Sequence, residues 1–166
     1  FAVVVEIDRL NQVAETAAGV DAEANNLAEA DVVSAPDLVV EGLSVTGAPR
    51  SGGTATVAWT TANRGNAPTP VGWSDRVVID RVDTGEVLAV VDLPHDGAAL
   101  APGVGLARSV AVALPAGLRG SGELRATVRA DYAPFGFGAV IEVVDGAAAE
   151  TNNTAALSFV SEATPY

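Results

Sequence analysis

The chain has 166 residues, neither Cys nor Met, and a formal net charge of −12, from 21 acidic residues and nine basic residues that are all Arg. The absence of Cys excludes a disulfide framework, a thiolate metal site and a Cys nucleophile, and the acidic balance argues against nucleic acid and anionic membranes as partners. With 49% hydrophobic residues the chain can bury a core, yet no stretch reaches the roughly 18 apolar residues of a membrane span.

Alternation of apolar and polar residues, the pattern of half-buried strands, dominates the sequence, and helical periodicity is scarce. In chain order it predicts strands over residues 38–41, 54–60, 73–79, 87–93, 110–114, 123–130 and 157–159. Gly, Pro, Asn and Asp cluster between these segments, as turns require. About seven short strands with one apolar face each are typical of an immunoglobulin-like sandwich. We therefore expect an all-β, seven-stranded β-sandwich with Trp59 and Trp73 as core aromatic residues.

The sequence also repeats part of itself. Residues 23–26 (EANN) recur as residues 150–153 (ETNN), and residues 13–15 (VAE) recur as residues 140–142 (VIE). Both matches have the same offset of 127 residues. Matching segments at one constant offset indicate an internal duplication.

The duplication extends upstream, where the alternating residues 1–7 match residues 124–130 at an offset of 123. The difference between the two offsets falls in the loop 132–139. Residues 1–35 are therefore predicted to be the last two strands of a preceding partial repeat, or a donated β segment, and residues 36–166 a complete repeat. We expect both ends of the sequence to lie inside a longer polypeptide.

An ordered set of short motifs in the second part resembles a known module. The motifs are residues 36–40 (PDLVV), 61–66 (TANRGN), 73–79 (WSDRVVI), 114–117 (LPAG), 130–131 (AD), 140–142 (VIE) and 150–153 (ETNN). Together they resemble CARDB, the cell-adhesion-related domain found in bacteria and archaea, over residues 36 to about 160. The resemblance implies an immunoglobulin-like sandwich, usually in tandem, in large secreted or surface proteins, without catalytic activity. The chain departs from the family pattern in the long loop 132–139.

The closing hairpin gathers carboxylate and amide side chains that suit a metal ion. These candidates are Asp131, Glu142, Asp145, Glu150, Asn152 and Asn153, and their counterparts in the partial repeat are Asp8, Glu15, Asp21, Glu23, Asn25 and Asn26. Ca²⁺ takes about six to eight oxygen ligands of this kind, and Ca²⁺ at module junctions would stiffen a string of domains. The alternative is that Asn and Asp cap turns while Glu142 and Glu150 face water. We expect that no cofactor is required and that Ca²⁺ is a possible ligand.

The long loop carries three aromatic residues, Tyr132, Phe135 and Phe137. They form either an exposed aromatic tip for carbohydrate or protein contact, or a cluster packed under its own loop. Both interpretations stay open, because the residue types suit a binding platform and a small satellite core equally well.

Two further polar residues have structural explanations. Asp75 falls on the apolar face of the strand 73–79, and a buried carboxylate is costly without hydrogen bonds. We expect it to bond to the backbone near residues 63–66 rather than to a ligand. His95 lies in a turn sequence without the nucleophile elbow that a catalytic base would serve, so we expect a surface turn residue.

We expect a non-catalytic structural or adhesive repeat module of a large extracellular or cell-surface protein, such as an adhesin stalk or fibre. One alternative is an accessory carbohydrate- or protein-binding module of a secreted hydrolase. Another is a subunit of a self-assembling filament or surface layer that uses residues 1–35 for strand exchange. The expected partners are neighbouring repeats, other copies, or a cell-surface polysaccharide or protein. We expect a secreted or surface location, no enzyme activity, no nucleic-acid partner and no membrane insertion.

Overall fold

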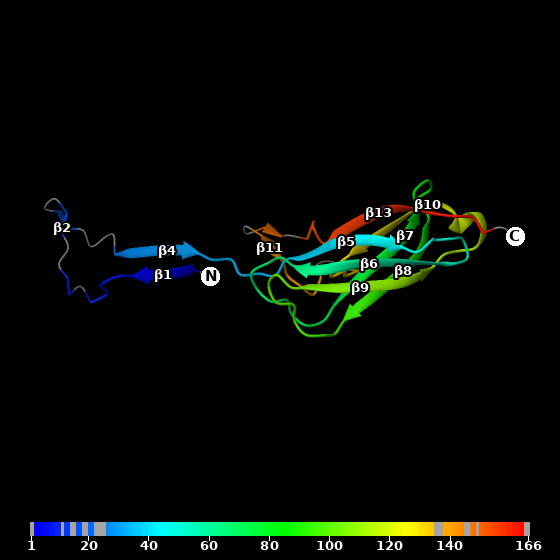
Figure 1. The fold of residues 1–166 in the computed structure, drawn as a ribbon. Coiled ribbons are helices and arrows are strands. Elements are labelled where there is room, and N and C mark those ends of the chain that lie inside the picture. The colour runs from blue at the N-terminus through cyan, green and yellow to red at the C-terminus, as the bar shows by residue number, and fades with distance from the viewer. Residues whose placement is uncertain are drawn as a thin grey trace. The chain divides into compact units, whose positions relative to one another are not determined.

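The computed structural model describes two compact units, unit 1 from Phe1 to Val33 and unit 2 from Ser34 to Tyr166 (Figure 1). The described residues are 2–10, 12–13, 16–17, 20–21, 26–134, 138–144, 147–148 and 150–164. None of these residues belongs to a helix long and apolar enough to cross a membrane.

Unit 2 is a sandwich of two antiparallel sheets (Figure 1). One sheet has the strand order β5 (Leu38–Thr46), β6 (Thr54–Asn63) and β9 (Gly105–Ala113). The other has the order β13 (Thr154–Ser161), β10 (Gly122–Arg129), β7 (Trp73–Arg81) and β8 (Val87–His95). Since β5, β6 and β9 lie in one sheet and β7, β8, β10 and β13 in the other, the chain crosses to the opposite sheet between β6 and β7, between β8 and β9, and between β9 and β10. The predicted all-β, immunoglobulin-like sandwich is confirmed.

The core lies between the sheets and follows the alternation of the sequence. In β10, Leu124, Ala126 and Val128 are fully buried, whereas Glu123 and Arg125 on the opposite face are exposed. The predicted core aromatics Trp59 and Trp73 are both buried. Burying each large aliphatic side chain contributes about 1.5–3 kcal/mol, so this shared face is the main source of stability.

Most strands extend further than their alternation predicts, and β5 and β9 show two physical reasons. β5 continues to Thr46 through a register shift between Glu41 and Ser44, where Gly42 has a φ of 61°. A bulge of this kind breaks the two-residue period, so the pattern ends early although the strand continues. β9 begins at Gly105 and carries Arg108 toward the core, which interrupts the apolar face.

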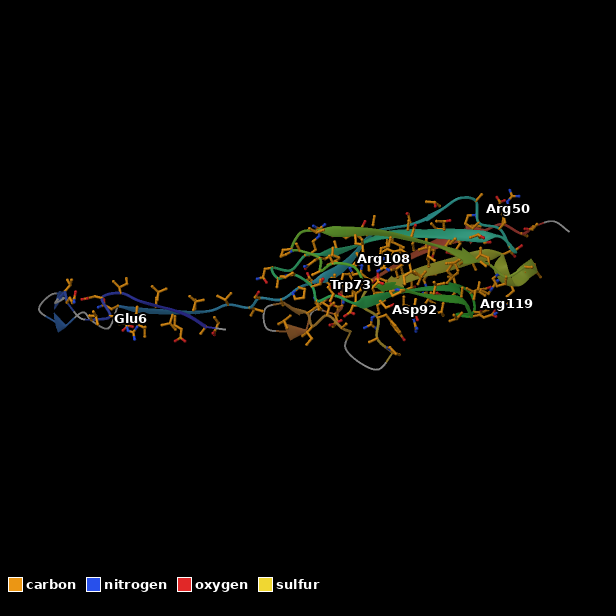
Figure 2. All side chains as sticks on the ribbon, turned by 90° about the horizontal axis from the view of Figure 1, so that it is seen from below. Glu6, Arg50, Trp73, Asp92, Arg108 and Arg119 are labelled. Carbon is orange, nitrogen blue, oxygen red and sulfur yellow. The ribbon has the colours of Figure 1, made fainter. Side chains whose placement is uncertain are left out.

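Unit 1 contains the antiparallel strands β1 (Ala2–Glu6) and β4 (Leu27–Asp31), and the short pair β2 (Thr16–Ala17) and β3 (Val20–Asp21). Every residue of β1 and β4 is exposed. The side chains of this pair project from both of its faces (Figure 2). The apolar residues of β1 and β4 are therefore not buried within unit 1.

The strand pairing of unit 1 matches that of the last part of unit 2. The pair Ala2↔Asp31 corresponds, at the sequence offsets of 123 and 127, to the pair Arg125↔Ser158. The other four pairs of β1 and β4 correspond to pairs of β10 and β13 in the same way. Both pairs of β2 and β3 correspond to those of β11 (Val143–Val144) and β12 (Ala147–Ala148). The two segments therefore share one register as well as a sequence pattern.

Candidate functional site

Asp131 closes the long loop that follows β10. It has a φ of 47°, and its Oδ1 and Oδ2 accept hydrogen bonds from the amides of Ala139 (2.9 Å) and Val140 (2.7 Å). A Cβ at Gly138 would overlap this carboxylate, so the loop needs glycine there. Burial raises the pKa of Asp131, although the two amides oppose the rise. Both carboxylate oxygens thus serve the loop backbone.

Asp8 holds the corresponding loop of unit 1 with the same geometry. Its φ is 50°, and its Oδ1 and Oδ2 accept hydrogen bonds from the amides of Gln12 (2.9 Å) and Val13 (2.7 Å). The backbone bond that follows is also shared, because Ile7 donates to the carbonyl of Asn26 at 2.8 Å. The equivalent bond in unit 2, between residues 130 and 153, has the same length.

Glu142 is buried, with 2% of its surface exposed, so the expectation that it faces water is wrong. Its Oε1 accepts a 2.8 Å hydrogen bond from the amide of Leu38, the first residue of β5. A buried amide at the start of a strand needs an acceptor, and this side chain supplies it. Burial is the main reason why the pKa of Glu142 rises to about 7, and the nearby carboxylates of Glu150 and Asp37 raise it further.

Two amide residues next to Glu142 tie the closing hairpin together. Asn153 is fully buried and donates from Nδ2 to Oε2 of Glu150 at 3.2 Å. Asn152 donates from Nδ2 to Oδ1 of Asp37 at 2.8 Å. Oε2 of Glu142 and Oδ1 of Asn153 are buried and find no hydrogen-bond partner among the described residues. Asn153 nevertheless lies close enough to Glu142 to oppose the rise in the pKa of its carboxyl.

The structure thus brings four of the predicted metal ligands to the start of β5, while Asp131 serves its own loop and Asp145 lies outside the described residues. Within the described ranges, no three or more His, Asp or Glu residues are grouped to hold a metal ion. Ca²⁺ binding therefore stays a prediction.

Asn63 is a further residue of this region with a structural role that the sequence patterns do not predict. It is fully buried, and its Oδ1 accepts hydrogen bonds from the amides of Asp37 and Gly65, both at 3.1 Å. Its Nδ2 donates to the carbonyls of Ala67 (2.8 Å) and Leu100 (2.9 Å). One side chain therefore joins three chain segments. The cluster of Asn and Gly residues at the end of β6 is the sequence signal for this role, although it is equally typical of a simple turn.

Asp75 has different partners from those predicted. It is fully buried, and its Oδ2 accepts hydrogen bonds from Trp59 Nε1 (3.1 Å) and Thr61 Oγ1 (2.7 Å) of the facing sheet. Nη1 of Arg108 lies 3.2 Å from the same oxygen. The predicted bond to the backbone near residues 63–66 is wrong, because Asp75 points across the middle of the sandwich and not toward that loop.

Arg108 completes this inter-sheet network. Its side chain is 8% exposed, and its Nη2 donates to the carbonyls of Leu93 (2.9 Å) and Pro94 (3.0 Å) on β8. Its Nη1 meets Asp75 at ion-pair distance without the alignment of a hydrogen bond. Figure 2 shows both Arg108 and Trp73 in the body of unit 2. Oδ1 of Asp75 is buried and finds no hydrogen-bond partner among the described residues, whereas Oδ2 of Asp75 and Nη2 of Arg108 bond to groups of both sheets, which supports a structural role.

Tyr132 is the one member of the predicted aromatic loop that the structure describes, since Phe135 and Phe137 lie outside the described residues. The guanidinium of Arg76 lies 3.7 Å from the centre of the Tyr132 ring, and that of Arg129 lies 5.8 Å away. The amide of Tyr132 donates to the carbonyl of Ser74 at 2.6 Å. Tyr132 is therefore half-buried against two arginines, and a binding role for the aromatic loop stays a prediction.

His95 is the last residue of β8, not part of the following turn. Its ring packs on Trp73 with the ring centres 4.0 Å apart, and its Nε2 lies 3.1 Å from the carbonyl of Ala98. These contacts make it a packing residue at the edge of the core.

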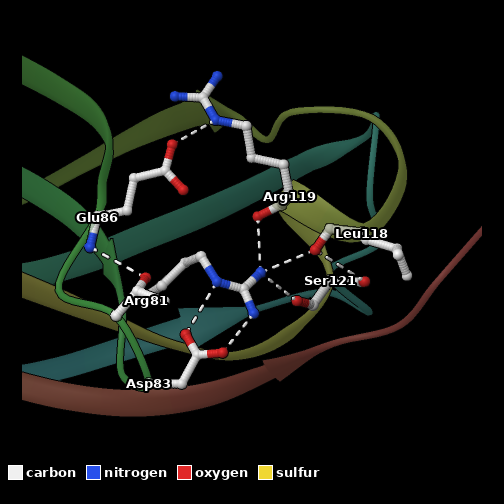
Figure 3. Close-up of polar contacts among 7 residues, drawn as sticks. Arg81, Asp83, Glu86, Leu118, Arg119 and Ser121 are labelled. Atoms are coloured by element: carbon white, nitrogen blue, oxygen red, sulfur yellow. Dashed lines mark hydrogen bonds and ion pairs between the residues drawn. The ribbon is translucent and has the colours of Figure 1, made fainter.

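At the β7–β8 turn, arginines neutralise the acidic residues (Figure 3). Arg81 donates from Nε and Nη2 to both oxygens of Asp83, and from Nη1 to two carbonyls of the 3₁₀ turn η2 (Gly117–Gly120). Arg119 of that turn donates to Glu86 at 2.7 Å. Hydrogen bonding to Arg81 lowers the pKa of Asp83. The bonds of Arg81 and Arg119 thus hold the β7–β8 turn against the 3₁₀ turn η2.

The described geometry defines a class of protein, an immunoglobulin-like sandwich module whose polar side chains fasten loops and sheets. Its fold is that of CARDB domains. The CARDB domain of the PF1109 protein from Pyrococcus furiosus, in a crystal structure with di-metal ions, matches with a TM-score of 0.54 and 18% identity over 81% of this chain and 100% of that domain. The solution structure of the same domain matches with a TM-score of 0.52 and 19% identity, over 78% and 98%.

No protein-family model matches the sequence, and no curated protein does either. The predicted resemblance to CARDB is confirmed at the level of the fold, which is all that a likeness at this identity shows.

Proposed function

We propose that the chain is a non-catalytic structural repeat module of a large extracellular or cell-surface protein, where it forms part of a stalk or fibre. The observation that carries this proposal is the register shared by unit 1 and the closing part of unit 2. Repeat proteins are built from such duplicated units, each contacting its neighbours along the array.

The described polar residues support a mechanical role. Asp131 and Asn63 fix loops through buried or part-buried hydrogen bonds, Glu142 fixes the start of β5, and Asp75 with Arg108 joins the two sheets. Side chains used in this way resist local distortion, because a distortion that breaks their hydrogen bonds leaves polar groups buried and unpaired. Such a module transmits force through its strands rather than moving to accommodate a substrate.

The experiment is surface labelling of cells that produce the full-length parent protein. An antibody against unit 2 should stain intact cells, and external protease should remove the signal. A cytoplasmic protein of the same cells is the control, since it should stain only after permeabilisation. Signal that appears only after permeabilisation would overturn the proposed location and with it the role as a surface stalk.

Cation binding at the closing hairpin is a second proposal. It is supported by the buried oxygens of Glu142 and Asn153, for which the described residues offer no hydrogen-bond partner, and by the di-metal ions bound to the PF1109 CARDB domain. The remaining ligands would come from Glu150, backbone oxygens or water, as Ca²⁺ sites commonly allow. Calorimetric titration with CaCl₂ to millimolar concentration should give a heat of binding that is lost in Glu142→Gln and kept in Glu123→Gln. The absence of heat in the parent chain would end this proposal.

A further inference from the structure

Unit 1 exposes an apolar strand face whose equivalent in unit 2 is buried. Val3, Val5 and Ile7 are 43%, 55% and 63% exposed. At the sequence offset of 123 they correspond to residues 126, 128 and 130, each of which has 0% exposure. The apolar character of the face is therefore explained if unit 1 belongs to a sandwich whose other strands cover it.

The strand edge of unit 1 also lacks the partner that its counterpart in unit 2 has. In unit 2, β10 pairs with β13 on one side and with β7 on the other. In unit 1, β1 pairs with β4 in a two-stranded sheet, so the edge that corresponds to the β7 side carries no strand of the described chain. An open strand edge beside an apolar face is a template for another strand.

Unit 2 shows what covers such a hairpin. The inner face of β10 and β13 packs on a body of five strands, β5 to β9, whose core residues include Leu38, Val57 and Ile79. β7 supplies the edge partner of β10 through six residue pairs from Leu124↔Arg81 to Arg129↔Arg76. The complement of a β10–β13 hairpin is therefore a five-stranded body with a β7-like edge.

We propose that the Val3, Val5 and Ile7 face and the open edge of β1 dock a five-stranded sandwich body equivalent to β5–β9, supplied by a preceding repeat of the same polypeptide. The β7 equivalent of that body pairs antiparallel with β1, and unit 1 acts as its closing hairpin. This inference rests on the proposed tandem arrangement and names the partner of unit 1.

Charge favours the same arrangement. In unit 2, Arg129 of β10 stands opposite Arg76 of β7. The unit 1 residue at the position of Arg129 is Glu6, so a preceding repeat that carries an arginine at the position of Arg76, as unit 2 does, would place opposite charges across the two strands. Opposite charges directly across an antiparallel pair are favourable, whereas like charges there are unfavourable.

The test is a graft within the full chain, in which residues 124–160 are replaced by a second copy of residues 1–33. Both tryptophans, Trp59 and Trp73, lie in the body of unit 2, so their fluorescence reports on that sandwich alone. A hairpin of the proposed kind should restore a cooperative urea transition of this signal. The grafted Val3 and Ile7 are larger than the alanines that they replace, and overpacking is destabilising. A second graft therefore carries Val3→Ala and Ile7→Ala.

The outcomes separate the alternatives. The proposal is supported if the graft with Val3→Ala and Ile7→Ala unfolds cooperatively. Within the grafted copy, Val5→Asp on the inner face should abolish this transition, and Val4→Asp on the outer face should keep it. No transition in either graft, or equal effects of the two Asp variants, overturns it. Such a failure removes the hairpin docking only, whereas failed surface labelling removes the proposed function.

Sedimentation of the unmodified chain tests whether the five-stranded body comes from a preceding repeat or from a second copy of this chain. A monomer over the whole concentration range agrees with a body supplied in cis by a preceding repeat. Self-association that Val5→Asp abolishes and Val4→Asp preserves would assign the face to a second copy of this chain, and so overturn the assignment to the preceding repeat.

Discussion

The carboxylate of Asp75 on β7 lies 3.2 Å from Nη1 of Arg108 on β9, so that a buried ion pair joins the two sheets of the sandwich. Both charges are removed from water, and neither has solvent to replace its partner. Removing one partner of the pair should therefore lower the stability of the fold strongly, because an uncompensated buried charge is destabilising.

We predict that Asp75→Ala lowers the free energy of unfolding by about 3–5 kcal/mol, because it leaves the Arg108 guanidinium buried without its counter-charge. Urea unfolding followed by tryptophan fluorescence measures the loss. In the double variant with Arg108→Met, part of the stability should return, since the orphaned charge is gone. Asp92→Ala, which breaks a surface pair with Arg76, is the control and should cost much less. Equal losses for Asp75→Ala and Asp92→Ala would contradict this role.

The titration of Glu142 predicts a pH dependence of stability. Burial raises its pKa from 4.5 to about 7, so the folded chain keeps this proton between those pH values while the unfolded chain loses it. The contribution of Glu142 to stability is thus fully present below pH 4.5 and is lost as pH rises through about 7. Burial raises the pKa of Asp131 and Glu150 as well, which adds to the same slope.

We predict that Glu142→Gln flattens this slope, because a neutral side chain of the same shape still accepts from the Leu38 amide and has no proton to lose. The parent chain should lose on the order of 3 kcal/mol between pH 4.5 and pH 8, measured by urea unfolding at each pH. Glu123→Gln changes an exposed glutamate of β10 and should keep the slope. An identical slope in the parent chain and in Glu142→Gln would show that another group titrates.

The fold could be predicted from the sequence wherever alternation alone determines burial. The polar site could not be predicted, because its buried polar groups bond to segments that are distant in the sequence. β10 shows the first case, since each inward residue from Leu124 to Val128 is apolar and each outward one polar or small. Arg108 and Glu142 show the second, because their partners lie on other strands and no local period marks them as buried. Their burial depends on tertiary contacts.

Gly138 offers a test of the loop that Asp131 closes. A Cβ at this position would overlap the Asp131 carboxylate, so Gly138→Ala should displace the loop and destabilise the fold by more than the ~1 kcal/mol by which Gly→Ala stabilises a site with room for the methyl group. In the background of Asp131→Ala the carboxylate is gone, and the same substitution should cost less. The coupling energy of this double-mutant cycle is the measurement. Additive effects would mean that the two residues act independently.

Asn63 provides the last prediction, because one buried amide holds the start of β5, its own loop and the segment before β9 together. Its four side-chain hydrogen bonds are all to backbone groups, and each contributes about 0.5–1.5 kcal/mol net. We predict that Asn63→Ala costs on the order of 3 kcal/mol in urea unfolding. Asn152→Ala removes an exposed amide at the same end of the sandwich and should cost little. Hydrogen exchange adds a second readout, since the amides of Asp37 and Gly65 should lose protection in Asn63→Ala and keep it in Asn152→Ala. Unchanged protection at both amides would show that the segment before β5 is held by its other contacts.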